Sequence, residues 1–452
     1  MPKVIKIRKG LNIPIVGEAE KILVRPKPSA TYAVKPIDFW GITPRLCVEP
    51  GDTVKAGTPL FVDKQRPQIA FTSPVSGTVA DVVRGARRAI QEVVITPSTE
   101  QEYEQFEAAD PTKLSREQVV DKMLRSGLWP HLVQRPFGVV ADPEAQPRDI
   151  YISCFDTAPL AVDMDFALQG DGKSFQAGIE ALRKLTTGEV HLGINAEYPE
   201  TRLLSGIKNV QKHYFVGPHP AGNVGVQIAQ VDPINKGEVV WTIRPQSVIM
   251  LGRLFLKGIY DASLVVATAG SGVAKPRYYQ AIQGARVDGI LEGVMADDDR
   301  PMRIISGNVL TGRRVEREGH LGFADNLISV IPEGKYHEFF GWMAPGFGKY
   351  SASRTFLSSL RFGKRYDLDT NYHGEERAYV VTGQYEKVMP FDIYPVYLIK
   401  AIMAGDIERM EQLGIYEVIE EDMALCEYVC TSKIEVQEVL RRGINTMMAE
   451  LS

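Results

Sequence analysis

DIYISCF, residues 149–155, opens the stretch of sequence that decides the fold of this chain. This β-rich run is followed by a helical pattern, a second strand, another helical segment and a third strand: KSFQAGIEALRKLTTG (173–188), EVHLGIN (189–195), RLLSGIKNV (202–210) and HYFVGP (213–218). Strands that alternate with helices pair in parallel through crossover helices. We therefore expect a doubly wound, Rossmann-like α/β domain, which spans residues 100–254 together with a leading connector.

The connector contains a helix whose two ends are marked in the sequence. Ser115, followed by Glu117 and Gln118, is typical of a helix start, and Gly127 is typical of a helix stop. The spacing of the apolar residues between them predicts a helix over residues 114–126.

Upstream, residues 48–95 have the pattern of short hairpins that fold over one another. VEPGDTVKAGTPL (48–60) and SPVSGTVADVV (73–83) place Gly turns before Val- and Thr-rich strands. The pattern resembles the biotinyl/lipoyl carrier fold, so we expect a biotinyl/lipoyl-like barrel within residues 1–99. The carrier versions of that fold modify a Lys, usually within Met-Lys-Met. Here Lys64 has no flanking Met, which favours an unmodified scaffold.

Downstream, the sequence becomes strand-rich and then helical. Four runs separated by Gly turns predict a β-grasp-like module over residues 255–335: SLVVATAG (263–270), ARVDGILEG (285–293), RIISGNVLTG (303–312) and LISVIPEG (327–334). Residues 336–452 contain a loop-rich stretch and two helical patterns, YPVYLIKAIMAGDIERMEQLG (394–414) and EEDMALCEYVCTSKIEVQEVLRRG (420–443). They predict a small C-terminal helical domain, and the whole chain is expected to be a multidomain α/β protein.

The composition excludes several classes of protein. A chain of 452 residues exceeds a single hydrophobic core, and its net charge of −4 gives no broad basic surface for nucleic acid. Four cysteines are too few for a disulfide framework, which favours a reducing compartment. The most apolar long stretch, residues 248–274, contains Arg253, Lys257 and Asp261. Three charges in that window argue against a membrane span.

Two segments imitate nucleotide-binding loops without meeting their requirements. GDGKS (170–174) resembles the end of a phosphate loop, but Ala167 stands where that loop needs Gly. AGSGVAKP (269–276) has Lys275 where a dinucleotide fingerprint needs its third Gly, so we expect a tight turn there.

The remaining candidates for chemistry are isolated side chains. Cys426 and Cys430 have i, i+4 spacing, which would place both thiols on one face of a helix, with no His nearby. We expect buried, inert cysteines and no metal site. His219, in GPHPAGNVGV (217–226), is expected to satisfy backbone groups, and no complete catalytic constellation is present.

Several long segments together resemble one family, the A subunits of sodium-translocating NADH:quinone reductases. They are KIRKGLNIPIVG (6–17), the barrel sequence, GPHPAGNVGVQIAQVDPIN (217–235), TAGSGVAKPRYYQ (268–280) and GWMAPGFGKYSASRTFLS (341–358). The resemblance implies a cytoplasmic subunit, peripheral on the inner membrane through the other subunits of a six-subunit complex. It implies that FMN, FAD and iron–sulfur centres in those partners carry electrons from NADH to quinone while sodium is exported.

The same architecture is similar to the flavin-binding subunit of complex I and its Rnf counterpart, which carry a Gly-rich flavin loop and a C-terminal Cys run. Here the loop reads RSGLWPHLVQRPF (125–137), where Trp129, His131 and Arg135 replace glycines. The departure favours an assembly or docking subunit that binds no cofactor itself and is not catalytic in isolation. The alternative is an autonomous flavin- or NAD-dependent dehydrogenase with a divergent site.

The aromatic-rich loop GWMAPGFGKY (341–350) is the candidate surface for docking. Aromatic residues, Met and Arg are enriched at protein interfaces. The loop could instead cap the β-module, or lie near a quinone, which the resemblance makes a candidate ligand. The residues proposed for the interface are Trp342, Met343, Phe347, Lys349, Tyr350 and Arg354.

Overall fold

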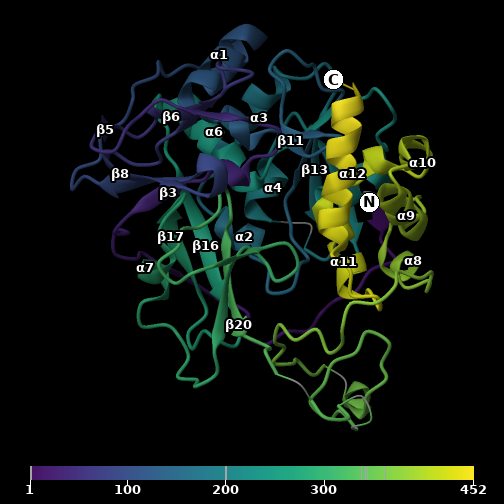
Figure 1. Cartoon of the computed structure of the whole chain (residues 1–452). Coiled ribbons are helices and arrows are strands. Elements are labelled where there is room, and N and C mark those ends of the chain that lie inside the picture. Colours follow the sequence, from purple (N-terminus) through teal and green to yellow (C-terminus); the bar gives the residue numbers. More distant parts are fainter. Residues whose placement is uncertain are drawn as a thin grey trace.

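The computed structural model describes residues 3–198, 201–336, 338–341, 343, 345–361 and 363–451, and of Arg202 the backbone alone. Figure 1 shows the barrel strands and the strands β16 (Ser263–Ala269), β17 (Arg277–Ile282) and β20 (Leu327–Pro332) on one side of a larger α/β unit, with the C-terminal helices along its other side. In the described part, no helix is both long and apolar enough to cross a membrane.

The α/β unit is built on a seven-stranded sheet in the order β1-β14-β13-β12-β15-β10-β11. The first five strands are parallel: β1 (Val4–Lys6), β14 (Gln211–Val216), β13 (Val190–Asn195), β12 (Ile150–Ser153) and β15 (Val240–Thr242). The sixth strand, β10 (Val133–Arg135), pairs antiparallel with β15 on one side and with β11 (Val139–Val140) on the other. The parallel pairing predicted for DIYISCF, EVHLGIN and HYFVGP is therefore confirmed.

Helices connect these strands and cover the sheet. They are α2 (Met164–Ala167), α3 (Gly172–Arg183), α4 (Arg202–Gly206), α5 (Val224–Val231) and α6 (Pro245–Lys257). Helices α3 and α6 approach closely because glycines lie at their contact. A Cβ on Gly178 would lie 2.2 Å from the Val248 carbonyl oxygen, and one on Gly252 1.7 Å from that of Ser174. The connector supplies η3 (Pro111–Lys113), α1 (Arg116–Ser126) and η4 (Trp129–His131).

The ends of α1 are those predicted. The Ser115 side chain accepts a hydrogen bond from the Gln118 amide while the Gln118 side chain accepts one from the Ser115 amide. Gly127 ends the helix in the left-handed region, at φ 78°. Both signals act within a few residues of the chain, which is why the sequence contains them.

Two small sheets form the N-terminal barrel-sandwich domain. One has the order β3-β9-β8-β5 and the other β4-β6-β7. Phe61 and Phe71 stack in its core, with ring centroids 4.6 Å apart. Lys64 is exposed between two strands of the second sheet. The elements are β3 (Tyr32–Val34), η1 (Pro36–Asp38), β4 (Pro44–Leu46), β5 (Thr53–Val54), β6 (Pro59–Asp63), β7 (Ala70–Thr72), β8 (Gly77–Arg84), η2 (Ala86–Arg88) and β9 (Ile90–Pro97).

The third sheet has six strands in the order β19-β18-β20-β16-β17-β2. They are β19 (Arg313–Val315), β18 (Met302–Ser306), β20 (Leu327–Pro332), β16 (Ser263–Ala269), β17 (Arg277–Ile282) and β2 (Glu20–Val24). The strand predicted in ARVDGILEG is wrong, because that run forms the helix α7 (Val287–Leu291). Its buried residues Val287, Ile290 and Leu291 follow helical spacing, and the strand lies just upstream, in RYYQAI.

The C-terminal region is helical, and each predicted helical pattern contains two helices. Gly405, at φ 71°, ends α9 (Pro395–Ala404) before α10 (Ile407–Gln412). The second pattern contains α11 (Glu420–Tyr428) and α12 (Val436–Leu451). The remaining elements are η5 (Leu357–Leu360), α8 (Tyr385–Val388) and η6 (Ile415–Glu417).

The N-terminal segment joins separate parts of the molecule. Strand β1 pairs with β14 at the edge of the α/β sheet, whereas β2 pairs with β17 in the six-stranded sheet. The chain enters the barrel only after both strands. The first 24 residues therefore tie two sheets together.

Candidate functional site

A cleft with a volume of about 750 Å³ is lined by residues from all parts of the chain. Its floor includes Ser153 and Thr242, at the carboxyl ends of β12 and β15. Ligands of open α/β sheets bind at this edge. The remaining walls come from the barrel, from turns of the six-stranded sheet and from α11 and α12.

Charged side chains of both signs line this cleft. Asp156 follows β12, and its carboxylate accepts a hydrogen bond from the Ala158 amide, at 2.8 Å. The surrounding protein raises the pKa of Asp156, although the side chain still contacts water at the cleft opening. Arg244 follows β15 and donates a hydrogen bond to the Ala324 carbonyl oxygen, at 2.6 Å, with Asp325 at 3.7 Å. Arg244 thus links the α/β unit to a turn of the six-stranded sheet.

His219 is buried in the cleft wall. Its Nδ1 lies 3.1 Å from the Thr157 hydroxyl, and its backbone amide donates to Asn12. The expectation that the ring satisfies backbone groups is wrong, because its partner is a side chain. Burial lowers the pKa of His219 to about 4, so the ring is neutral at pH 7.

The stretch RSGLWPHLVQRPF is packed into the protein. The Trp129 indole donates to the Ala141 carbonyl oxygen, at 2.8 Å, and packs edge-on against Trp241. His131 Nδ1 lies 2.7 Å from the Ser247 hydroxyl. The stretch's amides are bound in local turns: Gly127 N to Leu124 O, Leu128 N to Met123 O, His131 N to Leu128 O and Leu132 N to Trp129 O. A phosphate cradle needs such amides unbound and aimed at one point.

Arg135 joins this stretch to the C-terminal helices through two ion pairs, of which the one with Asp422 is buried. Its guanidinium donates to Asp422 at 2.6 Å and to Glu421 at 2.5 Å. The Arg135 side chain is 1 % exposed and that of Asp422 is fully buried. Burial raises the pKa of Glu421, with Arg135 acting in the opposite direction. Sequence reasoning missed these pairs, because residues 286 and 287 positions apart leave no local signal.

Cys426 and Cys430 are buried and unpaired, as predicted. The expectation that one helix carries both is wrong, because α11 ends at Tyr428 and the Cys430 amide donates to Glu427 in a closing turn. Burial raises the pKa of the Cys426 thiol. Over the described ranges, no three His, Cys, Asp or Glu residues are placed to hold a metal ion.

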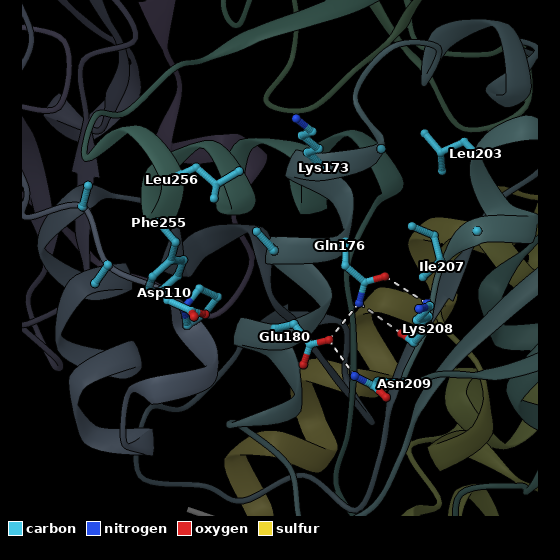
Figure 2. Close-up of a pocket in the computed structure, with 16 residues that line it drawn as sticks. Asp110, Lys173, Gln176, Glu180, Leu203, Ile207, Lys208, Asn209, Phe255 and Leu256 are labelled. Carbon is cyan, nitrogen blue, oxygen red and sulfur yellow. Dashed lines mark hydrogen bonds between the residues drawn. The ribbon is translucent and has the colours of Figure 1, made fainter.

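The two imitation loops also have local roles. In AGSGVAKP the Val273 amide donates to the Gly270 carbonyl oxygen at 3.1 Å, which makes the segment a tight turn, as predicted. The amides of Gly270 and Gly272 hold this turn to the carbonyl oxygens of Gly17 and Val330. GDGKS leads into α3, and Lys173 lies at an open pocket of about 920 Å³. Figure 2 shows one polar wall of that pocket, where Gln176, Glu180 and Asn209 are hydrogen-bonded.

The aromatic loop lies outside the cleft, in a part of the chain that projects beyond the end of β20 in Figure 1. Trp342 lies outside the described residues. Met343 and Phe347 are 64 % and 61 % exposed, and Arg354 is exposed at φ 56°. Lys349 pairs with Glu338, and the Tyr350 hydroxyl donates to the Asn12 carbonyl oxygen, at 3.2 Å.

Comparison with known proteins gives matches along most of the chain. Three family profiles match: the NqrA N-terminal barrel-sandwich hybrid domain (5–98), the NqrA second alpha/beta domain (114–260) and the NQRA C-terminal domain (265–317). The A subunit of the Na(+)-translocating NADH-quinone reductase of Hahella chejuensis is 39 % identical over 99 % of this chain and 100 % of its own length. That of Rhodopirellula baltica is 38 % identical, over 99 % and 98 %.

A solved structure of an NAD+-reducing NiFe hydrogenase in the air-oxidized state is a distant match. It is 12 % identical, with a TM-score of 0.38 over 75 % of this chain and 62 % of its own. A likeness this low supports no argument about function.

Proposed function

Because the chain belongs to the NqrA family, whose relatives named above are A subunits of Na(+)-translocating NADH-quinone reductases, we propose that it has the same place in such a complex. The complex couples reduction of quinone by NADH to export of sodium. The observation that carries this proposal is 38–39 % identity along 99 % of the chain.

The chain's own role in that complex is assembly and docking. Four amides of RSGLWPHLVQRPF are bound in turns, and Arg135 is bound to α11. This segment therefore braces the protein where a flavin loop would need open amides. The cysteines of the C-terminal region are two, and both are buried. FMN, FAD and iron–sulfur centres belong to partner subunits of a six-subunit complex, which holds this chain at the cytoplasmic face of the inner membrane.

The finer architecture is part of the same proposal. The chain is divided into four units: residues 1–99, 100–254, 255–335 and 336–452. The parallel sheet with its helices is a doubly wound Rossmann-like domain, and the six-stranded sheet is a β-grasp-like module. A secondary role of the chain is to bind a quinone headgroup near the cleft. The position of the cleft at the carboxyl ends of β12 and β15 favours this role.

The loop around residue 347 is the docking surface for the membrane subunits. Its members are Trp342, Met343, Phe347, Lys349, Tyr350 and Arg354. Met343 and Phe347 present large apolar side chains to solvent. The ion pair between Lys349 and Glu338 joins the two ends of the segment that contains them. Photo-crosslinkers at positions 343 and 347 will join the chain to one of the membrane subunits, whereas one at Lys113, the last residue of η3, will not.

Reconstitution tests the function directly. Membranes from a strain that lacks this chain will have lost sodium-stimulated NADH:quinone reductase activity, and adding the purified chain will restore it. Unchanged activity in the deletion strain would refute the proposal.

An autonomous dehydrogenase is the second candidate, and the volume and position of the cleft favour it. Titration of the isolated chain with FMN and with NADH decides between the two. Micromolar affinity for either would support the dehydrogenase, and absent or millimolar affinity would end it.

A further inference from the structure

Residues 335–365, here called the lobe, follow β20 and project from the rest of the molecule (Figure 1). The only regular element among its described residues is η5. The base of the lobe is fixed to the N-terminal segment. The Tyr366 amide donates to the Pro14 carbonyl oxygen at 2.8 Å, and the Val16 amide donates to that of Tyr366 at 3.0 Å. The fold therefore holds the lobe out in a defined direction.

The described residues of the lobe expose an unusual amount of apolar surface. The side chain of Phe339 is 92 % exposed and that of Leu360 is 72 % exposed. Others are about half exposed or more: Phe340, Met343, Phe347 and Leu357. Large apolar side chains gathered on one projecting segment mark a surface that meets an apolar phase or a partner.

The lobe is also strongly basic, although the whole chain has a net charge of −4. Its sequence has six Lys and Arg residues against the single acid Glu338. Glu338 pairs with Lys349, and Arg365 pairs with Glu18 at 2.6 Å. Among the described residues, no carboxylate lies within ion-pair distance of the four remaining cations: Lys335, Arg354, Arg361 and Lys364.

We propose that the lobe binds the surface of an anionic lipid bilayer. Its cations would contact lipid phosphates while its exposed Phe and Leu side chains enter the boundary between headgroups and acyl chains. Cations that flank exposed aromatic residues are the composition that binds at such surfaces. The inference extends the proposed function, because a chain docked on membrane subunits lies close to the lipid around them.

The charge pattern favours lipid over a protein partner. The centres of protein interfaces are depleted in Lys, whereas Lys contributes fully to binding an anionic bilayer. The lobe carries three Lys residues, and the Lys364 ammonium lies beside Phe347, donating to its carbonyl oxygen at 2.6 Å. Cations interleaved in this way with exposed apolar side chains suit a surface that is charged outside and apolar beneath.

Vesicle sedimentation of the full-length purified chain tests the proposal. The chain will bind vesicles of phosphatidylcholine mixed with phosphatidylglycerol, will bind pure phosphatidylcholine vesicles much more weakly, and will be released by salt. The triple variant Arg354→Gln, Arg361→Gln, Lys364→Gln will bind roughly a hundredfold more weakly, because each cation near an anionic surface contributes about a fivefold factor. Phe339→Ser with Leu360→Ser will weaken the binding that remains at high salt.

A matched control removes the same charge elsewhere. The variant Lys113→Gln, Lys173→Gln, Lys208→Gln changes three exposed Lys residues near α3 and will bind the anionic vesicles like the unchanged chain. Equal binding to both kinds of vesicle, or full binding by the lobe variant, would overturn the proposal. Crosslinks from position 339, the most exposed aromatic side chain among the described residues of the lobe, to protein alone in the assembled complex would also overturn it. The reconstitution assay is read separately, so restored reductase activity without lipid binding would end this inference and leave the chain's place in the reductase standing.

Discussion

Arg135 links the α/β sheet to the C-terminal helices by a buried ion pair. It extends from β10 to α11, where Asp422 also accepts a hydrogen bond from the Ile419 amide at the start of the helix. Gly225 makes room for this contact, since a Cβ there would lie 2.4 Å from an Asp422 oxygen and 2.6 Å from the Arg135 guanidinium. The segment GPHPAGNVGV therefore serves packing at its last glycine.

We expect Arg135→Met to lower the free energy of unfolding by about 3–5 kcal/mol, because it leaves the buried Asp422 carboxylate without a countercharge. Urea denaturation, monitored by the far-ultraviolet circular dichroism of the helices, measures the loss of stability. Arg125→Met is the matched control, since it breaks an Arg–Asp pair whose side chains are 68 % and 64 % exposed, and it will cost about 0.5 kcal/mol or less. The double variant Arg135→Met, Asp422→Leu will recover part of the loss. A small effect of Arg135→Met alone would contradict the account.

Two buried histidines make stability depend on pH. Burial lowers the pKa of His131 to about 3 and that of His219 to about 4, from an ordinary value of 6.5. Below pH 6.5 the unfolded chain binds protons that the folded chain does not, so stability is lost as the pH falls. Each histidine will contribute about 2 kcal/mol of loss between pH 7 and pH 5.

The variants His131→Gln and His219→Gln will each remove their share of this pH dependence, whatever they do to stability at pH 7. Gln105→Asn, at an exposed position, changes no titrating group and will leave the dependence unchanged. Thermal melts at pH 7 and pH 5 give the comparison. If all three variants lose the same stability between pH 7 and pH 5 as the unchanged chain, groups other than His131 and His219 control the acid response.

Among the elements, α3 and α6 form a contact that depends on two glycines. We expect Gly252→Ala to cost about 2 kcal/mol, because its Cβ would overlap the Ser174 carbonyl oxygen and force the helices apart. Gly289→Ala, in α7, is the control, since a Cβ there meets open space, and it will be neutral or stabilising by up to about 1 kcal/mol. The midpoints of denaturant unfolding test both. Equal effects would mean that the close helix contact contributes little.

Elements with local signals could be predicted from the sequence, and others could not. The two ends of α1 were predictable because the Ser115–Gln118 pair and Gly127 act within one turn each. The helix α7 was assigned as a strand because five residues contain too few turns to separate a period of 3.6 from one of 2. The end of α11 before Cys430 carries no Gly or Pro, so the sequence did not mark it.

At the scale of the whole molecule, long-range placement was the part that the sequence could not supply. Strands of three to five residues, such as β1 and β2, join different sheets according to the packing around them. The cleft likewise depends on the tertiary fold, because its lining residues Asp156, Arg244 and Glu421 come from distant parts of the chain. The partner complex was predictable through family resemblance alone, since neither composition nor motif spacing names a sodium pump.

The central claim is that the chain docks within its complex without a redox cofactor of its own. Affinity purification of the tagged chain from gently solubilised host membranes, with assay of the eluate for sodium-stimulated quinone reduction by NADH, tests it most directly. The account predicts that this activity elutes with the chain, and that the chain is colourless once it is dissociated, while the flavin absorbance stays with the membrane subunits. The opposite result would contradict it: a chain that elutes free of membrane subunits, carries its own flavin absorbance and oxidises NADH without any response to sodium.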